Sequence, residues 1–206
     1  MTNKILFDTS LNERNLKRKE FILNKIKKYR DPKKSIILEV GIGNGRFGKL
    51  LGDAFKKYLG VDPDKEYVEL AKKNIPDNAR ITYLEGSAEH IPFYEPVDII
   101  FYANSWHFIK NLNSAIQEAN RLLKEDGIII ILEPSEKTTN WKDPKLSKDS
   151  KQFDQKLLDK KIKALRAAKE KLEGQKLFKI LEKSFVDFSE SEFYLLCKRK
   201  DGAEEE

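Results

Sequence analysis

The 206-residue chain is poor in the residue types that build disulfides and metal centres. It has one cysteine, Cys197, and two histidines, so it forms no internal disulfide and a His/Cys metal cluster is not expected. No apolar run is long enough to cross a bilayer, and the residues after Met1 do not resemble a signal peptide. These absences predict a cytoplasmic protein with no membrane segment and no bound metal.

Charge, in contrast, is abundant. Lysine and arginine number 40 against 34 acidic residues, a net charge of +6, and charged residues make up 36% of the chain, against about 25% in ordinary domains. Lysine and glutamate dominate, which is a thermophile-like composition. The basic excess is therefore weak evidence for a nucleic-acid partner. The length suits one domain with a full core.

The stretch 35–47 organises the chain. An apolar run ends in a turn containing Gly41, Gly43 and Gly45, and helical spacing begins at Arg46. Such a strand–turn–helix unit gathers backbone N–H groups around one crevice, which is typical of a nucleotide-type site. Residues 43–48 satisfy the dinucleotide pattern G-x-G-x-x-G, whereas a register from Glu39 reads acidic-x-Gly-x-Gly-x-Gly.

In the register from Glu39, the turn resembles the first motif of class I S-adenosylmethionine-dependent methyltransferases. Later segments resemble that family in the right order: Asp62-Pro63 after a second strand, the loop 85–93, and Asn104 after a fourth strand. The segment 121–127 and the isoleucine-rich strand after it also resemble that family. The resemblance therefore covers Ser35 to Pro134.

The resemblance implies that S-adenosylmethionine is the cofactor and S-adenosylhomocysteine the product. The Asp62 carboxylate would accept hydrogen bonds from ribose hydroxyls, a role that it could also play for NAD. Ser87 stands where the family has aspartate, so it would accept from the adenine amine more weakly. The expected cofactor residues are Glu39, Gly41, Gly43, Gly45, Asp62, Pro63, Ser87, Ala88 and Asn104.

Trp106 and His107 are expected on the substrate side of the site. In-line transfer from a sulfonium needs mainly alignment of the reacting groups, so a general base is required only for an acceptor that is protonated at neutral pH. His107 is the histidine placed to act as that catalytic base.

The expected fold class is α/β: a doubly wound, mostly parallel seven-stranded sheet with an antiparallel C-terminal strand and helices on both faces. Residues 1–34 form an N-terminal capping helix, which starts at a Ser10-x-x-Glu13 capping box and carries a basic outer face. Residues 35–198 form the methyltransferase domain, with a loop and a long helix at 135–174, and 199–206 a disordered tail. Within the domain we expect a turn at 124–127, a short helix at 177–181, and a hairpin with its turn at 189–191.

The leading hypothesis is a methyltransferase for a small-molecule acceptor, with weak nucleic-acid association and no membrane partner. An RNA or protein methyltransferase that uses the basic helices is an alternative. An NAD-dependent oxidoreductase and a non-catalytic adenosine-binding protein stay open as further alternatives. The sequence does not identify the acceptor atom or the oligomeric state.

Overall fold

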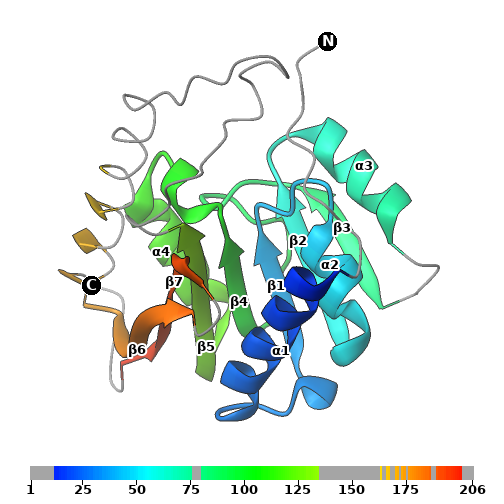
Figure 1. The fold of residues 1–206 in the computed structure, drawn as a ribbon. Coiled ribbons are helices and arrows are strands. Elements are labelled where there is room, and N and C mark those ends of the chain that lie inside the picture. Colours follow the sequence, from blue (N-terminus) through cyan, green and yellow to red (C-terminus); the bar gives the residue numbers. More distant parts are fainter. Residues whose placement is uncertain are drawn as a thin grey trace, which may run out of the picture.

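The computed structural model describes residues 12–75, 80–134, 176–186 and 189–200, together with seven helical positions between 163 and 174. A seven-stranded sheet with the order β3-β2-β1-β4-β5-β7-β6 runs through the molecule (Figure 1). Its strands are β1 (Ile36–Val40), β2 (Lys57–Asp62), β3 (Ile81–Glu85), β4 (Val97–Ala103), β5 (Leu123–Pro134), β6 (Phe178–Val186) and β7 (Ser189–Arg199).

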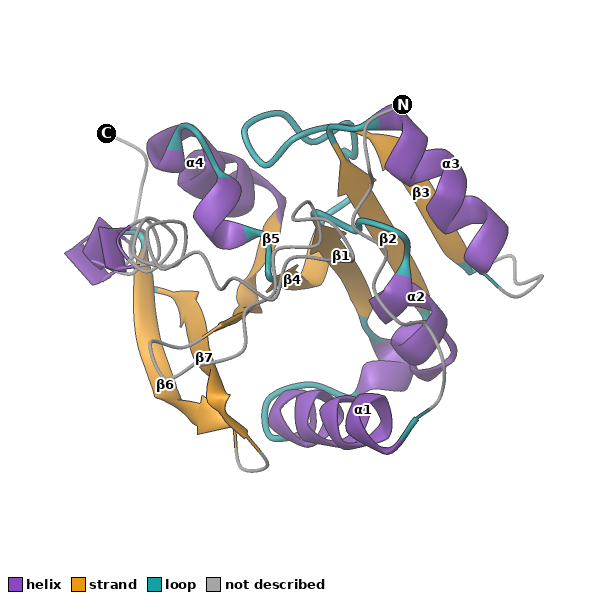
Figure 2. Ribbon diagram, turned by 45° about the horizontal axis from the view of Figure 1, so that its top comes forward, coloured by secondary structure: helices purple, strands orange, loops and turns teal. Residues whose placement is uncertain are grey.

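Helices cover both faces of this sheet, and α1 and α4 lie on opposite sides (Figure 2). The α-helices are α1 (Glu13–Lys27), α2 (Arg46–Leu51), α3 (Lys65–Asn74) and α4 (Leu112–Leu122). Short 3-10 helices are η1 (Pro32–Lys34), η2 (Gly52–Ala54) and η3 (Trp106–Phe108). Strands β1 to β5 are parallel to one another, and β7 is antiparallel to both β5 and β6. The predicted fold class is confirmed.

Strand β1 lies where the chain changes direction across the sheet. Val40, its last residue, pairs with Val61 of β2 on one side and with Tyr102 of β4 on the other. The turn after β1 therefore opens between the carboxyl ends of β2 and β4. In open α/β sheets this switch point is where ligands bind.

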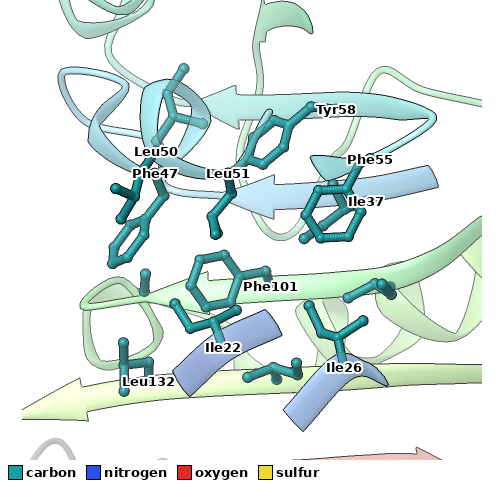
Figure 3. Packing of buried hydrophobic residues seen from close by; sticks show 14 of the residues in the cluster. Ile22, Ile26, Ile37, Phe47, Leu50, Leu51, Phe55, Tyr58, Phe101 and Leu132 are labelled. Carbon is teal, nitrogen blue, oxygen red and sulfur yellow. The ribbon is translucent and has the colours of Figure 1, made fainter. Parts of the chain in front are cut away.

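Two apolar layers hold the sheet in place, because alternate strand residues face opposite sides. Ile37 and Phe101 face α1 and α2, where Ile22 and Ile26 of α1 pack over them (Figure 3). The other face, which includes Leu38 and Ile100, packs against α4. All seven residues of β4 are buried, as expected for a central parallel strand.

Helix α1 begins later than the sequence suggests. Its N-cap is Asn12, whose side chain accepts a hydrogen bond from the Asn15 N–H at 2.9 Å. The predicted capping box from Ser10 is therefore wrong, and Ser10 itself lies outside the described residues. An asparagine side chain caps a helix as well as serine does, so the later start leaves no cap missing.

The predicted basic outer face of α1 is confirmed for Arg14, Lys17 and Lys28, whose side chains are more than half exposed, and wrong for Arg18. Arg18 is 8% exposed and bonds to Glu192 of β7, and Arg14 bonds to the same carboxylate at 3.1 Å. Three more cations are paired: Lys25 and Lys28 with Glu182 of β6 at 3.0 and 3.1 Å, and Lys17 with Glu13 in its own helix. These five cations join α1 to β6 and β7 or bond within the helix, so each of them already has a carboxylate partner.

Three local predictions fail in the second half of the chain. The short helix at 177–181 is strand β6, residues 189–191 belong to β7, and 124–127 belong to β5. Pairing of Phe178 and Ile180 with β7 overrides the helical spacing there. Strands β6 and β7 do form the predicted antiparallel hairpin, with Val186 paired to Ser189, and 124–127 lie where the register between β4 and β5 shifts. The described positions between 163 and 174 are helical, while the predicted loop at 135–150 and the residues 201–206 lie outside the described residues.

Candidate functional site

The turn after β1 takes a backbone shape that favours glycine. Gly41, Gly43 and Gly45 have positive φ values of 82°, 52° and 77°. The turn is fixed by the Gly41 N–H, which donates to the Val61 carbonyl at 2.8 Å. A Cβ on Gly41 would come within 2.4 Å of the Ser105 Cβ, so a larger residue would force apart the segments that follow β1 and β4.

Asp62, the last residue of β2, holds this turn from the side. Its Oδ2 accepts from the Gly43 N–H at 2.9 Å, and its Oδ1 accepts from the Asp64 N–H at 3.0 Å. The residue is 7% exposed. Each carboxylate oxygen can accept more than one hydrogen bond, so the pair keeps capacity for ligand hydroxyls. Pro63, next to it, is exposed.

Glu39 is buried beneath the turn, on the sheet face that carries α1 and α2. It is 1% exposed, and its carboxylate accepts from the Tyr58 hydroxyl at 2.8 Å. Burial raises the pKa of Glu39 to about 8, against the opposing effects of the Tyr58 hydrogen bond and the positive charge of Arg46. Glu39 thus links β1 to Tyr58 of β2 within the core.

The loop after β3 lies against Asp62. The Gly86 N–H donates to the Asp62 carbonyl at 3.1 Å, and Ser87 and His90 exchange backbone hydrogen bonds at 3.1 and 3.2 Å. Ala88 is buried, whereas His90 is exposed. Helix α4 clamps the loop, because Glu118 accepts from the Ile91 N–H at 3.0 Å. Ser87 and Ala88 are therefore held next to the end of β2.

The segment after β4 completes this edge of the sheet. Asn104 adopts a left-handed conformation with φ 56°, uncommon for a non-glycine residue, and its N–H donates to the Leu132 carbonyl at 2.8 Å. Ser105 donates from its hydroxyl to the Val40 carbonyl at 2.6 Å. Trp106 is 2% exposed and packs edge-on against Tyr102. Its ring lies in the core, so it is not placed to contact a substrate.

Sequence reasoning missed Glu133, near the end of β5. This carboxylate is fully buried and accepts from the Trp106 N–H at 2.7 Å with Oε1. Its Oε2 lies 2.5 Å from Nδ1 of His107, whose side chain is 3% exposed. An acidic residue at the carboxyl end of an isoleucine-rich central strand was the available signal. A buried carboxylate at that position needs a partner, and here the partner is an imidazole.

Gly48, the last glycine of the dinucleotide pattern, has a packing reason to be glycine. It lies inside α2, and a Cβ there would overlap the Tyr83 hydroxyl at 1.6 Å. Most of the predicted cofactor residues thus gather at one edge of the sheet, and Glu39 lies beneath them. In the described part of the chain, no three His, Cys, Asp or Glu side chains are grouped to hold a metal ion. No helix among the described residues is long and apolar enough to cross a membrane.

Known proteins that this chain resembles are described as methyltransferases. Residues 38–131 match the family model described as a methyltransferase domain. The chain is 34% identical over 102 residues to a putative methyltransferase of Dictyostelium discoideum, a match that covers 49% of this chain and 37% of that protein. The chain spans about two fifths of the length of the curated relatives that it matches first.

Solved structures share the fold. A putative type 11 methyltransferase from Sulfolobus solfataricus has a TM-score of 0.63 and 23% identity, with 92% of this chain and 95% of that chain covered. Phosphoethanolamine N-methyltransferase 1 of Haemonchus contortus, solved with phosphoethanolamine and S-adenosylhomocysteine, has a TM-score of 0.66 and 19% identity. That match covers 100% of this chain and 47% of the other.

Proposed function

We propose that this chain, whose α/β domain belongs to the class I S-adenosylmethionine-dependent methyltransferase family, transfers a methyl group to a small-molecule acceptor. The observation that carries the proposal is the bond between Asp62 and the Gly43 N–H. It joins an acidic strand end to a glycine turn at the switch point of the sheet, where an adenosine ligand would bind.

The residues at this edge fit S-adenosylmethionine. A side chain on Gly41 would fill the space against Ser105, and the two Asp62 oxygens retain acceptor capacity for ribose hydroxyls. The strand order β3-β2-β1-β4 would then spread the cofactor across the sheet edge. Ser87 and Ala88 would lie beside the base, and Asn104 beside the methionine part.

When bound, this cofactor supplies a methyl group that is activated by a positively charged sulfur. The chain would contribute mainly alignment, because holding two reactants in line supplies much of the rate acceleration. His107, held by Glu133, would take a proton from an acceptor that is protonated at neutral pH.

A small acceptor is favoured over RNA by the pairing of the α1 cations. Arg14 and Arg18 bond to Glu192, and Lys25 and Lys28 bond to Glu182. A nucleic acid would have to displace those carboxylates before it gained the phosphate contacts that dominate its affinity. The phosphoethanolamine that accompanies the Haemonchus contortus enzyme in its structure is also a small molecule.

Calorimetric titration with S-adenosylmethionine, S-adenosylhomocysteine and NAD in parallel tests the cofactor. We expect a dissociation constant in the micromolar range, about −8 kcal/mol, for S-adenosylhomocysteine and no heat from NAD. Binding of NAD with no response to S-adenosylhomocysteine would overturn the proposal.

Transfer of labelled methyl groups from S-adenosylmethionine then tests the acceptor. The label is offered in turn to pooled small metabolites, to RNA and to protein. We expect it in the small-molecule fraction. Label in RNA or protein would promote the polymer alternative, and binding without transfer to any fraction would indicate a non-catalytic adenosine-binding protein.

A further inference from the structure

We propose that Arg121 and Glu118 of α4 are positioning residues for the cofactor, because they hold residues 86–93 in the shape that receives the base. We refer to residues 86–93 as the base loop. The inference rests on the proposed function, in which Ser87 and Ala88 lie beside the base. It gives a role in cofactor binding to two side chains of a helix that lies beside the proposed site.

Arg121 and Glu118 form a doubly bonded ion pair on α4. The Arg121 Nε donates to Oε1 of Glu118 at 2.9 Å, and its Nη2 donates to Oε2 at 2.8 Å. The hydrogen bond from Arg121 is the largest cause that holds the pKa of the Glu118 carboxyl below its ordinary value, so the carboxylate is charged near neutral pH. Two parallel bonds between planar groups fix both side chains in one orientation.

This ion pair bonds three backbone groups of the base loop. Oε2 of Glu118 accepts from the Ile91 N–H at 3.0 Å. Arg121 donates from Nη2 to the Ile91 carbonyl at 3.1 Å and from Nη1 to the Phe93 carbonyl at 3.2 Å. Residues 91–93 belong to no helix or strand, so the two side chains supply hydrogen bonds that a neighbouring strand would otherwise give.

Apolar packing holds the same segment against α4. Ile91 is 1% exposed and Phe93 is 8% exposed, and both lie in the apolar layer that contains Ala115 and Ile116 of α4. The end of the base loop therefore has apolar contacts beneath it and charged hydrogen bonds to its backbone. Together they attach this end of the loop to one helix.

A closed turn carries this attachment to Ser87 and Ala88. Ser87 and His90 exchange backbone hydrogen bonds at 3.1 and 3.2 Å, which ties Ser87 to the residue before Ile91. At the start of the loop, the Gly86 N–H bonds to the last residue of β2. The position of Ser87 and Ala88 is thus set by β2 on one side and by α4 on the other.

A loop that is held in advance loses less entropy when a ligand binds to it. Without the ion pair, binding of the base would also have to order the loop, so affinity would fall for a ligand that carries a base. A ligand that lacks the base gains nothing from the ordered loop and should bind as before. This difference separates a positioning role from a general effect on the fold.

Hydrogen–deuterium exchange tests the attachment in the unliganded protein. We expect Arg121→Ala to speed exchange of the amides of 86–93 by about 10-fold or more, and to leave the β4 amides unchanged. Lys72→Ala is the matched control, because Lys72 and Glu69 form an ion pair of the same i,i+3 spacing within α3. It should leave exchange of the base loop unchanged. Equal exchange in the wild type and Arg121→Ala would overturn the inference.

Two ligands that differ only in the base test the effect on the cofactor site. S-ribosylhomocysteine is S-adenosylhomocysteine with a hydroxyl in place of adenine. Direct calorimetry gives the affinity for S-adenosylhomocysteine, and displacement calorimetry gives that for S-ribosylhomocysteine. We expect Arg121→Ala and Glu118→Ala to weaken the first by about 10-fold or more and the second by less than about twofold. Lys72→Ala should change neither affinity.

Each other outcome has a defined meaning. Equal losses with both ligands, or a loss with neither, would overturn the inference. Unaltered protein that binds both ligands equally would overturn it too, because the base would then have no place on the loop. Failure of the unaltered protein to bind S-adenosylhomocysteine would instead count against the proposed function, with the exchange result unaffected. If Arg121→Ala does not fold, as judged by thermal melting, Arg121→Lys, which keeps the charge but lacks the planar fork, provides the same comparison.

Discussion

Replacement of Glu39 by glutamine should stabilise the protein at pH 8 and change its stability little at pH 5. Glu39 is 1% exposed and accepts a hydrogen bond from Tyr58. Burial, with a smaller effect from Asp62, raises the pKa of its carboxyl from 4.5 to about 8. Glutamine has nearly the same shape, can accept the same hydrogen bond and does not ionise.

The sign follows from proton binding. Between pH 4.5 and 8 the folded protein keeps the Glu39 proton and the unfolded chain loses it, so the free energy of unfolding falls as pH rises. The slope approaches about 1.4 kcal/mol per pH unit. By pH 8 the wild type has lost about 3–5 kcal/mol relative to the glutamine variant, against less than about 1 kcal/mol at pH 5.

Urea denaturation of both proteins at several pH values between about 5 and 8 measures this difference. Glu85→Gln, at the exposed end of β3, is the matched control and should show no pH-dependent difference from the wild type. Wild-type and Glu39→Gln stabilities that change in parallel with pH would refute a neutral, buried Glu39.

Three further predictions follow from the same structure. Calorimetry should show that Asp62→Ala weakens binding of S-adenosylhomocysteine by about 10- to 150-fold. Asp53→Ala, at an exposed position, is the control and should leave the affinity unchanged. An unchanged affinity in Asp62→Ala would place Asp62 outside the site. Hydrogen bonds from Lys25 and other partners outweigh burial and lower the pKa of Glu182 to about 2, so its carboxylate should stabilise the fold above pH 4.5. Glu182→Gln should therefore lower the free energy of unfolding by about 1–3 kcal/mol at pH 7 and by less as pH falls towards 2. Denaturation curves that show an equal loss at pH 3 would contradict this. Filter binding should detect only weak RNA association that disappears near 200 mM salt, and retention at that salt would contradict the pairing of the α1 cations.

The parallel half of the fold was predictable because its signals are local. Each of the strands β1 to β4 has a short apolar run; the glycine turn and Asn104 follow strand ends directly, and Asp62 is the last residue of β2. The carboxyl ends of parallel neighbours meet at one edge, so a correct strand order brings these residues together. The cofactor residues could therefore be proposed before any contact was known.

The missed features depend on partners far away in the sequence. Phe178 and Leu181 have an apolar spacing that also suits a helix, and β7 decides in favour of a strand. Arg18 looks like a surface cation until Glu192, 174 positions later, is placed beside it. Glu133 likewise gains its meaning from His107 on another strand end, a pairing that no local pattern encodes.

The strand order at the β6–β7 side has a consequence for synthesis of the chain. Strand β7 is made after β6 but lies between β5 and β6, so neither can complete its pairing until residues 189–199 have left the ribosome. Until then Arg18 and Phe21 of α1 also lack Glu192 and Tyr194. A stalled nascent chain would thus present an open β5 edge, a template for pairing with other chains, and would be prone to aggregate.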